Sequence, residues 1–218
     1  MIQPHGGRLV DRVLKIKQKQ EILEKAKSLP AVKLNAESVS DIENIATGVF
    51  SPIEGFMGKE NFRHVLNEMR LSSDLPWTIP IVLDVTKDAA AKLKIGGQVI
   101  LLNELKEPVA VLHLEEKYGY DNEEMAAKVF QTTDAAHPGV AKVKAMEDVL
   151  LAGKIDLIQE SPTPYARYKL SPKETRILFK EKGWRTILVY QEFDGRRYPD
   201  AACLIPQDAK PEPESACR

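Results

Sequence analysis

Cysteine is nearly absent from this chain of 218 residues. The two cysteines, Cys203 and Cys217, both lie near the end of the sequence. A disulfide framework or a cysteine-based zinc site needs more thiols at closer spacing, so we expect neither. The fold must then depend on ordinary packing, and 43% of the residues are hydrophobic, which is enough for a proper core.

Long hydrophobic runs and an excess of one charge are also lacking. No stretch of about 18 apolar residues occurs, and the opening Met-Ile-Gln-Pro-His-Gly-Gly contains no apolar core of a signal peptide. The 31 basic and 32 acidic side chains give a net charge of −1, which provides no general attraction for nucleic acid or an anionic membrane. We therefore expect a cytoplasmic protein with no membrane partner, in which any anion site is local.

Histidine is scarce, and the four imidazoles are scattered along the sequence. Without a carboxylate pair nearby they make no convincing metal site, and we interpret His64 and His113 as surface or packing residues. His5 precedes two glycines whose N–H groups could approach an anion, although a terminal hairpin or a docking role is commoner. His137 precedes Pro-Gly and could be a ligand or an acid–base group, but a turn histidine bonded to the backbone is again commoner.

The first third of the sequence has the periodicity of helices. Apolar positions at near-helical spacing predict an amphipathic helix within residues 8–33 and a further helix over residues 60–69. Between them, Ser40 and Glu43 have capping-box spacing, which predicts a short helix that stops at Gly48.

From residue 77 onward the composition is typical of short strands. Segments rich in β-branched residues predict four strands, over residues 79–85, 99–102, 109–113 and 155–158. Asp121 and Glu124 open a predicted helix through Val129, and residues 132–140 are expected to form a polar loop. The pattern predicts an α+β fold, with a small barrel or curled sheet flanked by helices.

A second module begins after a proline-rich linker. Ser171 and Glu174 form a complete N-terminal cap and Gly183 a stop, which predicts a well-specified helix. Residues 186–190, Thr-Ile-Leu-Val-Tyr, predict a strand buried on both faces, so an α/β domain starts here. It does not continue, because residues 195–218 contain four prolines and no sustained periodicity, and we expect this tail to be disordered.

Six strings of the sequence together resemble a known family. They are Pro4-His5-Gly6-Gly7-Arg8-Leu9-Val10, residues 45–58 (Ile-Ala-Thr-Gly-Val-Phe-Ser-Pro-Ile-Glu-Gly-Phe-Met-Gly), Met69-Arg70-Leu71, residues 76–81 (Pro-Trp-Thr-Ile-Pro-Ile), Thr132-Thr133-Asp134 and His137-Pro138-Gly139-Val140. In this order they are similar to the N-terminal signatures of ATP sulfurylases (sulfate adenylyltransferases), with similarity from Pro4 to Gln191. Asp74 and Gln131 depart from the glycine usual there, at a cost of about 1 kcal/mol where a turn needs positive φ.

The resemblance implies a division of the chain into three parts. Residues 1–168 would form a PUA-like domain, a small curled sheet or pseudo-barrel with flanking helices. Residues 169–191 would be the truncated start of the nucleotidyltransferase catalytic domain, and residues 192–218 a divergent tail. The family reaction activates sulfate, ATP + sulfate → adenylyl sulfate + pyrophosphate, in sulfate assimilation.

The active site that the resemblance implies is mostly missing from the sequence. In this family the first catalytic strand ends in Gln-x-Arg-Asn-Pro, soon followed by His-x-x-His, and these groups with Mg²⁺ stabilise charge on the phosphoryl oxygens of ATP. Here only Gln191 matches, and no histidine follows His137. Gln191 is the one substrate-binding candidate. We expect no catalytic residue, metal site or cofactor in this chain, although the complete family enzyme uses Mg-ATP, and no activity of the chain alone.

A second hypothesis is a stand-alone PUA-like module that binds RNA or a protein partner. Basic residues outnumber acidic ones between residues 8 and 33, including Lys15, Lys17 and Lys19, and PUA folds can bind RNA. A solvated helix face is the commoner explanation, because no aromatic residues for base stacking are interleaved with these charges. We therefore expect a catalytic domain or a second copy of the chain as partner rather than nucleic acid.

Overall fold

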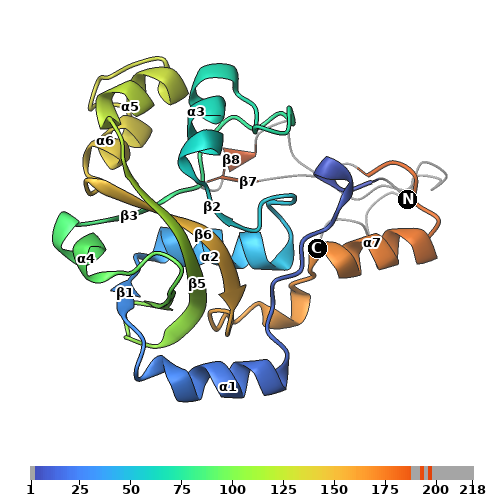
Figure 1. Cartoon of the computed structure of the whole chain (residues 1–218). Coiled ribbons are helices and arrows are strands. Elements are labelled where there is room, and N and C mark those ends of the chain that lie inside the picture. The colour runs from blue at the N-terminus through green and yellow to red at the C-terminus, as the bar shows by residue number, and fades with distance from the viewer. Residues whose placement is uncertain (1–2, 188–191, 194–195, 198–218) are drawn as a thin grey trace. The chain divides into compact units, whose positions relative to one another are not determined.

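The chain divides into two compact units (Figure 1). The computed structural model describes residues 3–187, 192–193 and 196–197. One unit spans Gln3–Lys169, and the other includes the chain from Leu170 onward.

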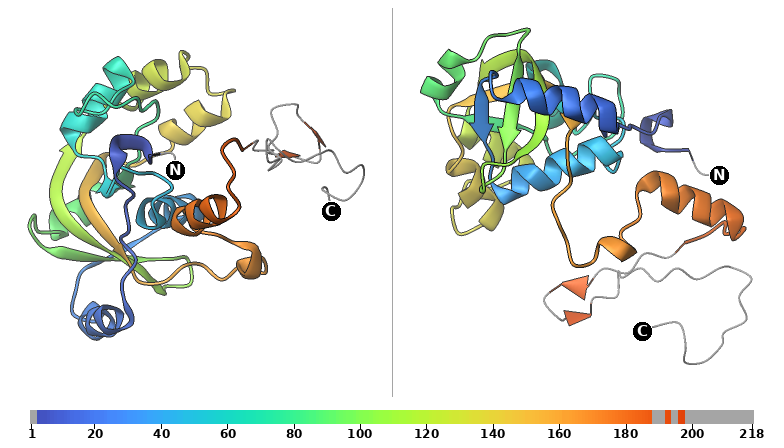
Figure 2. Two further views of the ribbon diagram at one scale, coloured as in Figure 1. Left: turned by 90° about the vertical axis from the view of Figure 1, so that its right-hand side faces the viewer. Right: turned by 90° about the horizontal axis from the view of Figure 1, so that it is seen from below.

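The first unit is built on a six-stranded sheet. Its strands are β1 (Ala31–Lys33), β2 (Gly55–Phe56), β3 (Leu83–Val85), β4 (Gln98–Leu102), β5 (Pro108–Gly119) and β6 (Val149–Leu157). The order is β1-β4-β5-β6-β2, with β3 also paired to β6, and only β1 and β4 run parallel. The long strands β5 and β6 curve strongly (Figure 2). The mixed α+β fold with a curled sheet is therefore confirmed.

The second edge of β6 is completed by three segments from earlier in the chain. Residues 83–85 pair with residues 149–151, and Gly55 and Phe56 pair with Lys154 and Gly153. At the far end of the strand, Val13 forms a parallel bridge with Leu157. Most of this edge thus obtains its partners from remote parts of the sequence, which leaves few backbone groups of β6 unpaired there.

Helices cover both faces and one end of the sheet. Those of the first unit are α1 (Ile16–Ala26), α2 (Ala36–Thr47), α3 (Lys59–Glu68), α4 (Lys87–Lys92), α5 (Asn122–Phe130) and α6 (Pro138–Lys144). The main core lies between α2, with Ile42 and Ile45, and the inner face of the sheet. On the other face, α1 packs Ile22 near Ile100 and Val111. Helices α3, α5 and α6 gather at one end of β5 and β6 around their own apolar cluster (Figure 1).

The N-terminal segment differs from the expectation of one helix within residues 8–33. Helix α1 begins only at Ile16, and the residues before it run extended along the sheet. The Leu14 N–H donates to the Leu157 carbonyl at 2.9 Å, and the Leu157 N–H donates to the Arg12 carbonyl at 2.9 Å. These hydrogen bonds between distant segments of the chain replace helical ones, so tertiary pairing overrides the local periodicity.

Two further predicted boundaries were wrong for local reasons. Helix α2 begins four residues before Ser40, because the Asn35 side chain accepts the Ser38 N–H at 2.8 Å and caps the helix there. The predicted loop over residues 132–140 contains the start of α6, whose first residue is Pro138. Proline lacks an N–H and is well suited to that position. The predicted stop at Gly48 is confirmed, with φ 88°.

The predicted strands differ from the observed ones mainly in length. Within residues 79–85 only Leu83–Val85 form a ladder. Strand β5 continues to Gly119 and β6 begins already at Val149, since polar residues such as Lys117 and Lys154 interrupt the apolar pattern but still pair in the ladder.

Asp74 and Gln131 both adopt the left-handed conformation that the resemblance predicted for glycine. Their φ angles are 64° and 57°. We expect Gln131→Gly to raise the free energy of unfolding by about 0.5–1 kcal/mol, because glycine has no Cβ to strain there. Gln20→Gly, in the middle of α1, should lower it by about 1 kcal/mol. Urea denaturation of both variants tests the pair, and a lower stability of Gln131→Gly would contradict the prediction.

The second unit contains the helix that the sequence predicted most sharply. Helix α7 spans Pro172–Glu181, with the Ser171 Oγ accepting the Glu174 N–H at 3.3 Å and Glu174 accepting the Ser171 N–H at 2.7 Å. Gly183 follows with φ 69°. Of the predicted strand over residues 186–190, the first two residues are described and form no strand, and the others lie outside the described residues.

Four residues of the divergent tail, which was predicted over residues 192–218, are described. They form a two-stranded antiparallel ladder of β7 (Glu192–Phe193) and β8 (Arg196–Arg197). The remaining residues of that tail lie outside the described part of the chain. No helix among the described residues is long and apolar enough to cross a membrane.

Candidate functional site

Three of the signature strings, far apart in the sequence, meet at one place in the first unit. The His5 Nε2 atom lies 3.0 Å from the Pro76 carbonyl oxygen, and its ring centroid lies 6.2 Å from that of Trp77. Phe50 contacts the same indole edge-on, at 6.0 Å between centroids. The strings that begin at Pro4, Ile45 and Pro76 thus form one cluster, which we call the motif cluster.

Glycine permits the close approach of these strings. Gly48 has φ 88°, and a Cβ there would overlap the Val10 carbonyl oxygen. Gly6 has φ 71°, and its Cβ would lie 2.9 Å from side-chain carbons of Pro52 and Leu75. Both positions therefore require glycine for conformation and for space.

Ser51 links two of the strings through a buried hydroxyl. Its Oγ donates to the Gly48 carbonyl at 2.7 Å and accepts the Val10 N–H at 3.0 Å. Ser51 is the one polar residue among the buried side chains of the described residues. The hydroxyl thus satisfies a backbone donor and a backbone acceptor from which water is excluded.

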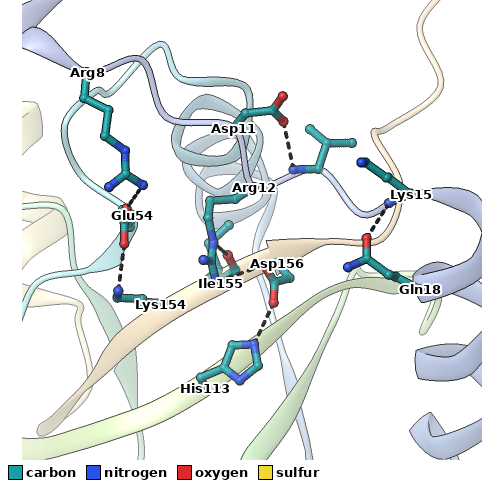
Figure 3. A network of polar contacts seen from close by, with 11 residues as sticks. Arg8, Asp11, Arg12, Lys15, Gln18, Glu54, His113, Lys154, Ile155 and Asp156 are labelled. Carbon is teal, nitrogen blue, oxygen red and sulfur yellow. Dashed lines mark hydrogen bonds and ion pairs between the residues drawn. The ribbon is translucent and has the colours of Figure 1, made fainter.

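A charged network continues from the motif cluster along β6 (Figure 3). Glu54 accepts a charge-assisted hydrogen bond from Arg8 and pairs with Lys154 at 2.9 Å. Further along, Arg12 pairs with Asp156 at 2.9 Å, and its Nε donates to the Ile155 carbonyl at 2.9 Å.

The two carboxylates of this network have different surroundings. The hydrogen bond from Lys154 lowers the pKa of Glu54, with Arg8 and Arg12 adding to the effect and burial opposing it. Asp156 also lies 2.7 Å from the His113 Nε2 atom. Since each carboxylate has cationic or imidazole partners from the protein, the arrangement fixes the N-terminal segment on the sheet rather than leaving a charge for a ligand.

The motif cluster also borders a hollow of about 430 Å³. Residues 52–58 and 152–154 form much of its wall, together with Glu115 and Glu116. The Glu116 carboxylate accepts the Lys59 N–H at 2.9 Å, at the start of α3. Among the described residues no group of three histidine, cysteine, aspartate or glutamate side chains could hold a metal ion.

Two of the histidines and Gln191 lie away from the motif cluster or outside the described residues. The His137 Nδ1 accepts the Gly139 N–H at 3.1 Å, so it is a turn histidine bonded to the backbone. His64 lies on α3, 3.4 Å from Glu68. Gln191 lies outside the described residues, so its role in substrate binding stays a prediction.

Sequence reasoning missed Ser51, Glu54 and the pair of Arg12 and Asp156. Ser51 and Glu54 belong to a string that was used only for the family resemblance, and Arg12 lies within residues 8–33, where a solvated helix face was expected. A signal was available for Glu54, because a carboxylate within the otherwise apolar run Phe-Ser-Pro-Ile-Glu-Gly-Phe needs a partner.

Helix α2 contributes two further acidic groups, Glu43 and Asp41, whose pKa values shift in opposite directions. Glu43 accepts the Ser161 N–H at 2.7 Å and pairs with Lys169 at 3.1 Å. Burial raises the pKa of Glu43, but these hydrogen bonds outweigh burial and lower it. The bonds fix the segment that ends the first unit against α2. For Asp41, burial and the nearby Glu37 raise the pKa to about 6, with Lys142 opposing them.

We expect Asp41→Asn to stabilise the protein above pH 6. The folded-state pKa of Asp41 is above its ordinary value of about 3.9, so ionisation between about pH 4 and pH 6 lowers the stability of the wild type. The variant should be more stable by about 1–2 kcal/mol at pH 7, allowing for the water that still reaches the carboxyl. At pH 3.5 the two proteins should unfold alike. Thermal unfolding across this pH range tests the prediction, and a variant no more stable than the wild type at pH 7 would contradict it.

The fold of the first unit is similar to that of known proteins. A family model described as a PUA-like domain matches residues 2–160. Among solved structures, a hexameric APS kinase from Thiobacillus denitrificans is similar, with TM-score 0.68 and 25% identity over 88% of this chain and 34% of that chain.

Sulfate adenylyltransferases are similar over nearly the whole sequence. Those of Hyperthermus butylicus and Pyrococcus abyssi are 52% and 48% identical over 93% of this chain, and that of Nostoc punctiforme is 46% identical over 87%. A match over 93% of 218 residues is longer than residues 1–191, so it includes part of the segment 192–218. The chain spans 53%, 53% and 49% of these relatives, about half their length. The chain therefore belongs to the PUA-like domain family, and its sequence is similar to about half of each of these sulfate adenylyltransferases.

Proposed function

We propose that this chain is the non-catalytic portion of a sulfate adenylyltransferase and serves sulfate activation together with a nucleotidyltransferase half. The observation that carries the proposal is the extent of the match, which spans about half of each relative. The complete reaction would be ATP + sulfate → adenylyl sulfate + pyrophosphate, with Mg-ATP bound by the other half. The chain alone would be inactive, and the cytoplasm is its proposed location.

The proposed division of the chain places a PUA-like domain at residues 1–168, the start of the catalytic domain at residues 169–191 and a divergent segment at residues 192–218, the first part of which lies inside the match. The compact unit Gln3–Lys169 and the family match over residues 2–160 support the first boundary. In this scheme Gln191 is the one residue that would contact substrate.

Helix α7 supports the idea that a second domain begins after Lys169. Its caps are complete, yet none of its residues is buried. Beside it lies an open groove of about 670 Å³, with Thr175, Phe179 and Trp184 in its wall. An isolated helix of this length is marginal in water, so α7 is the kind of element that a larger core stabilises.

Measurement of pyrophosphate release from Mg-ATP and sulfate tests the proposal. The purified chain should give none. Mixing it with the half of the Hyperthermus butylicus relative that lies outside the match, produced as a separate chain, should give activity well above that half alone. Turnover by the chain alone, or no gain on mixing, would overturn the proposal.

A second candidate function, RNA binding, is favoured by one observation. Lys15 and Lys17 are exposed at the start of α1, where the first turn contains no acidic residue. If RNA is the ligand, binding should weaken steeply with salt and disappear when Lys15, Lys17 and Lys19 are changed to glutamine. Binding that is unchanged in this variant would exclude α1 as the RNA site.

A further inference from the structure

Three exposed apolar side chains and the half-buried Trp77 indole lie within or beside the strings of the motif cluster. Val49, Met69 and Ile79 are 54%, 62% and 52% exposed, and the Trp77 indole is half-buried beside them. The Trp77 N–H donates to the Met69 carbonyl and its Nε1–H to the Ile79 carbonyl, both at 2.8 Å. Val49 precedes Phe50, whose ring contacts the indole. We call these four residues the Trp77 patch.

Three of the four patch residues lie in one loop, residues 69–79, which is held by internal hydrogen bonds. The Arg70 guanidinium donates to the Asp74 carbonyl at 2.6 Å, and the Leu71 N–H donates to the Leu75 carbonyl at 2.8 Å. His5 adds the contact to Pro76 from the N-terminal segment. A loop with this many internal bonds keeps its exposed apolar groups in one arrangement, which lowers the entropy lost when a partner binds.

A single exposed apolar residue elsewhere on the first unit provides the comparison. Leu105, at 79% exposed, lies in the turn between β4 and β5, and single residues of this kind are normal on protein surfaces. All four residues of the Trp77 patch lie in the strings on which the family resemblance rests, whereas Leu105 does not.

We propose that the Trp77 patch is the surface on which the nucleotidyltransferase half of a sulfate adenylyltransferase docks. This inference rests on the proposed function, because that half is the partner it names. The relatives carry about as much chain outside the match as within it, so the partner is large enough to cover the patch. The patch contains no lysine, and Arg70 is already paired with Asp74, so the surface fits an apolar protein face rather than a phosphate backbone.

The double variant Val49→Glu with Ile79→Glu tests the surface. Titration calorimetry would measure its binding to the separately produced second half of the Hyperthermus butylicus relative. We expect affinity to fall on the order of tenfold or more, since two charges replace apolar groups at the contact. Leu105→Glu, the matched control, should bind within about twofold of wild type. Thermal unfolding of both variants should match wild type, because the changed side chains are more than half exposed.

The outcomes separate this inference from the proposed function. Equal binding of the double variant and wild type overturns the inference, while pyrophosphate release by both mixtures would leave the proposed function standing. If the wild type instead self-associates and the double variant does not, a second copy is the occupant and the inference is wrong. If the wild type binds no second half at all, both proposals fail.

Discussion

Replacing Gly153 by alanine is expected to destabilise the first unit by about 3 kcal/mol or more, a large part of the stability of a small domain. Gly153 lies in β6 with φ 147°, opposite a register shift in β5 between Leu114 and Glu116. A Cβ at this position would overlap the His113 carbonyl oxygen and lie 3.0 Å from the Glu115 nitrogen. Both neighbours are backbone atoms of β5, so neither can move without breaking the ladder.

The matched control for this prediction is Gly119→Ala at the end of β5. A Cβ there would lie 3.9 Å from the Asp148 carbonyl oxygen, which is ordinary contact. We expect this variant to change stability by less than about 1 kcal/mol. Urea denaturation of both proteins decides the matter, and similar midpoints for the two variants would show that the space around Gly153 is not limiting.

Ser51→Ala is expected to cost about 2 kcal/mol and to loosen the N-terminal segment. The substitution leaves the buried Val10 N–H and the Gly48 carbonyl without the hydroxyl that joins them. Besides the lower free energy of unfolding, the Val10 amide should exchange its hydrogen faster, which a general loss of packing at residue 51 would not single out.

Ser73→Ala, in an exposed position, provides the comparison for Ser51. It should leave both the stability and the exchange of the Val10 amide unchanged. Ser51→Ala with wild-type exchange at Val10 would mean that the hydroxyl has no part in attaching the N-terminal segment.

Local signals in the sequence predicted the elements whose ends are determined by their own residues. Asp121 accepts the N–H groups of Glu123 and Glu124 at the start of α5, and Ser171 and Glu174 cap α7. Gly48 ends α2 in the left-handed conformation. Each of these groups interacts within a few residues, so the spacing in the sequence contains the information.

Long-range pairing explains the elements and contacts that the sequence did not predict. The residues before α1 are extended because the backbone groups of Arg12 and Leu14 bond to Leu157 in β6. The Arg12 side chain also donates to the Ile155 carbonyl, which is 143 residues away in the sequence. The periodicity of about a dozen neighbouring residues cannot identify a hydrogen-bond partner that is so distant in the sequence.

The same reason applies to the candidate site. The sequence identified the strings of the motif cluster as related to a family, but not that His5 would meet Pro76 and Trp77. The backbone hydrogen bond of His137 was predicted correctly, because its partner, Gly139, is only two residues away. The role of Gln191 stays a prediction, since it lies outside the described residues.

The completed edge of β6 has a consequence for the order in which the protein can fold. Residues 12–14, 55–56 and 83–85 are all synthesised well before residues 149–157, the strand with which they pair. On the ribosome these earlier segments therefore remain without partners until most of the first unit has been translated. Contacts of such high sequence separation close large loops and slow folding, so we infer a unit that closes late and in one step around β6.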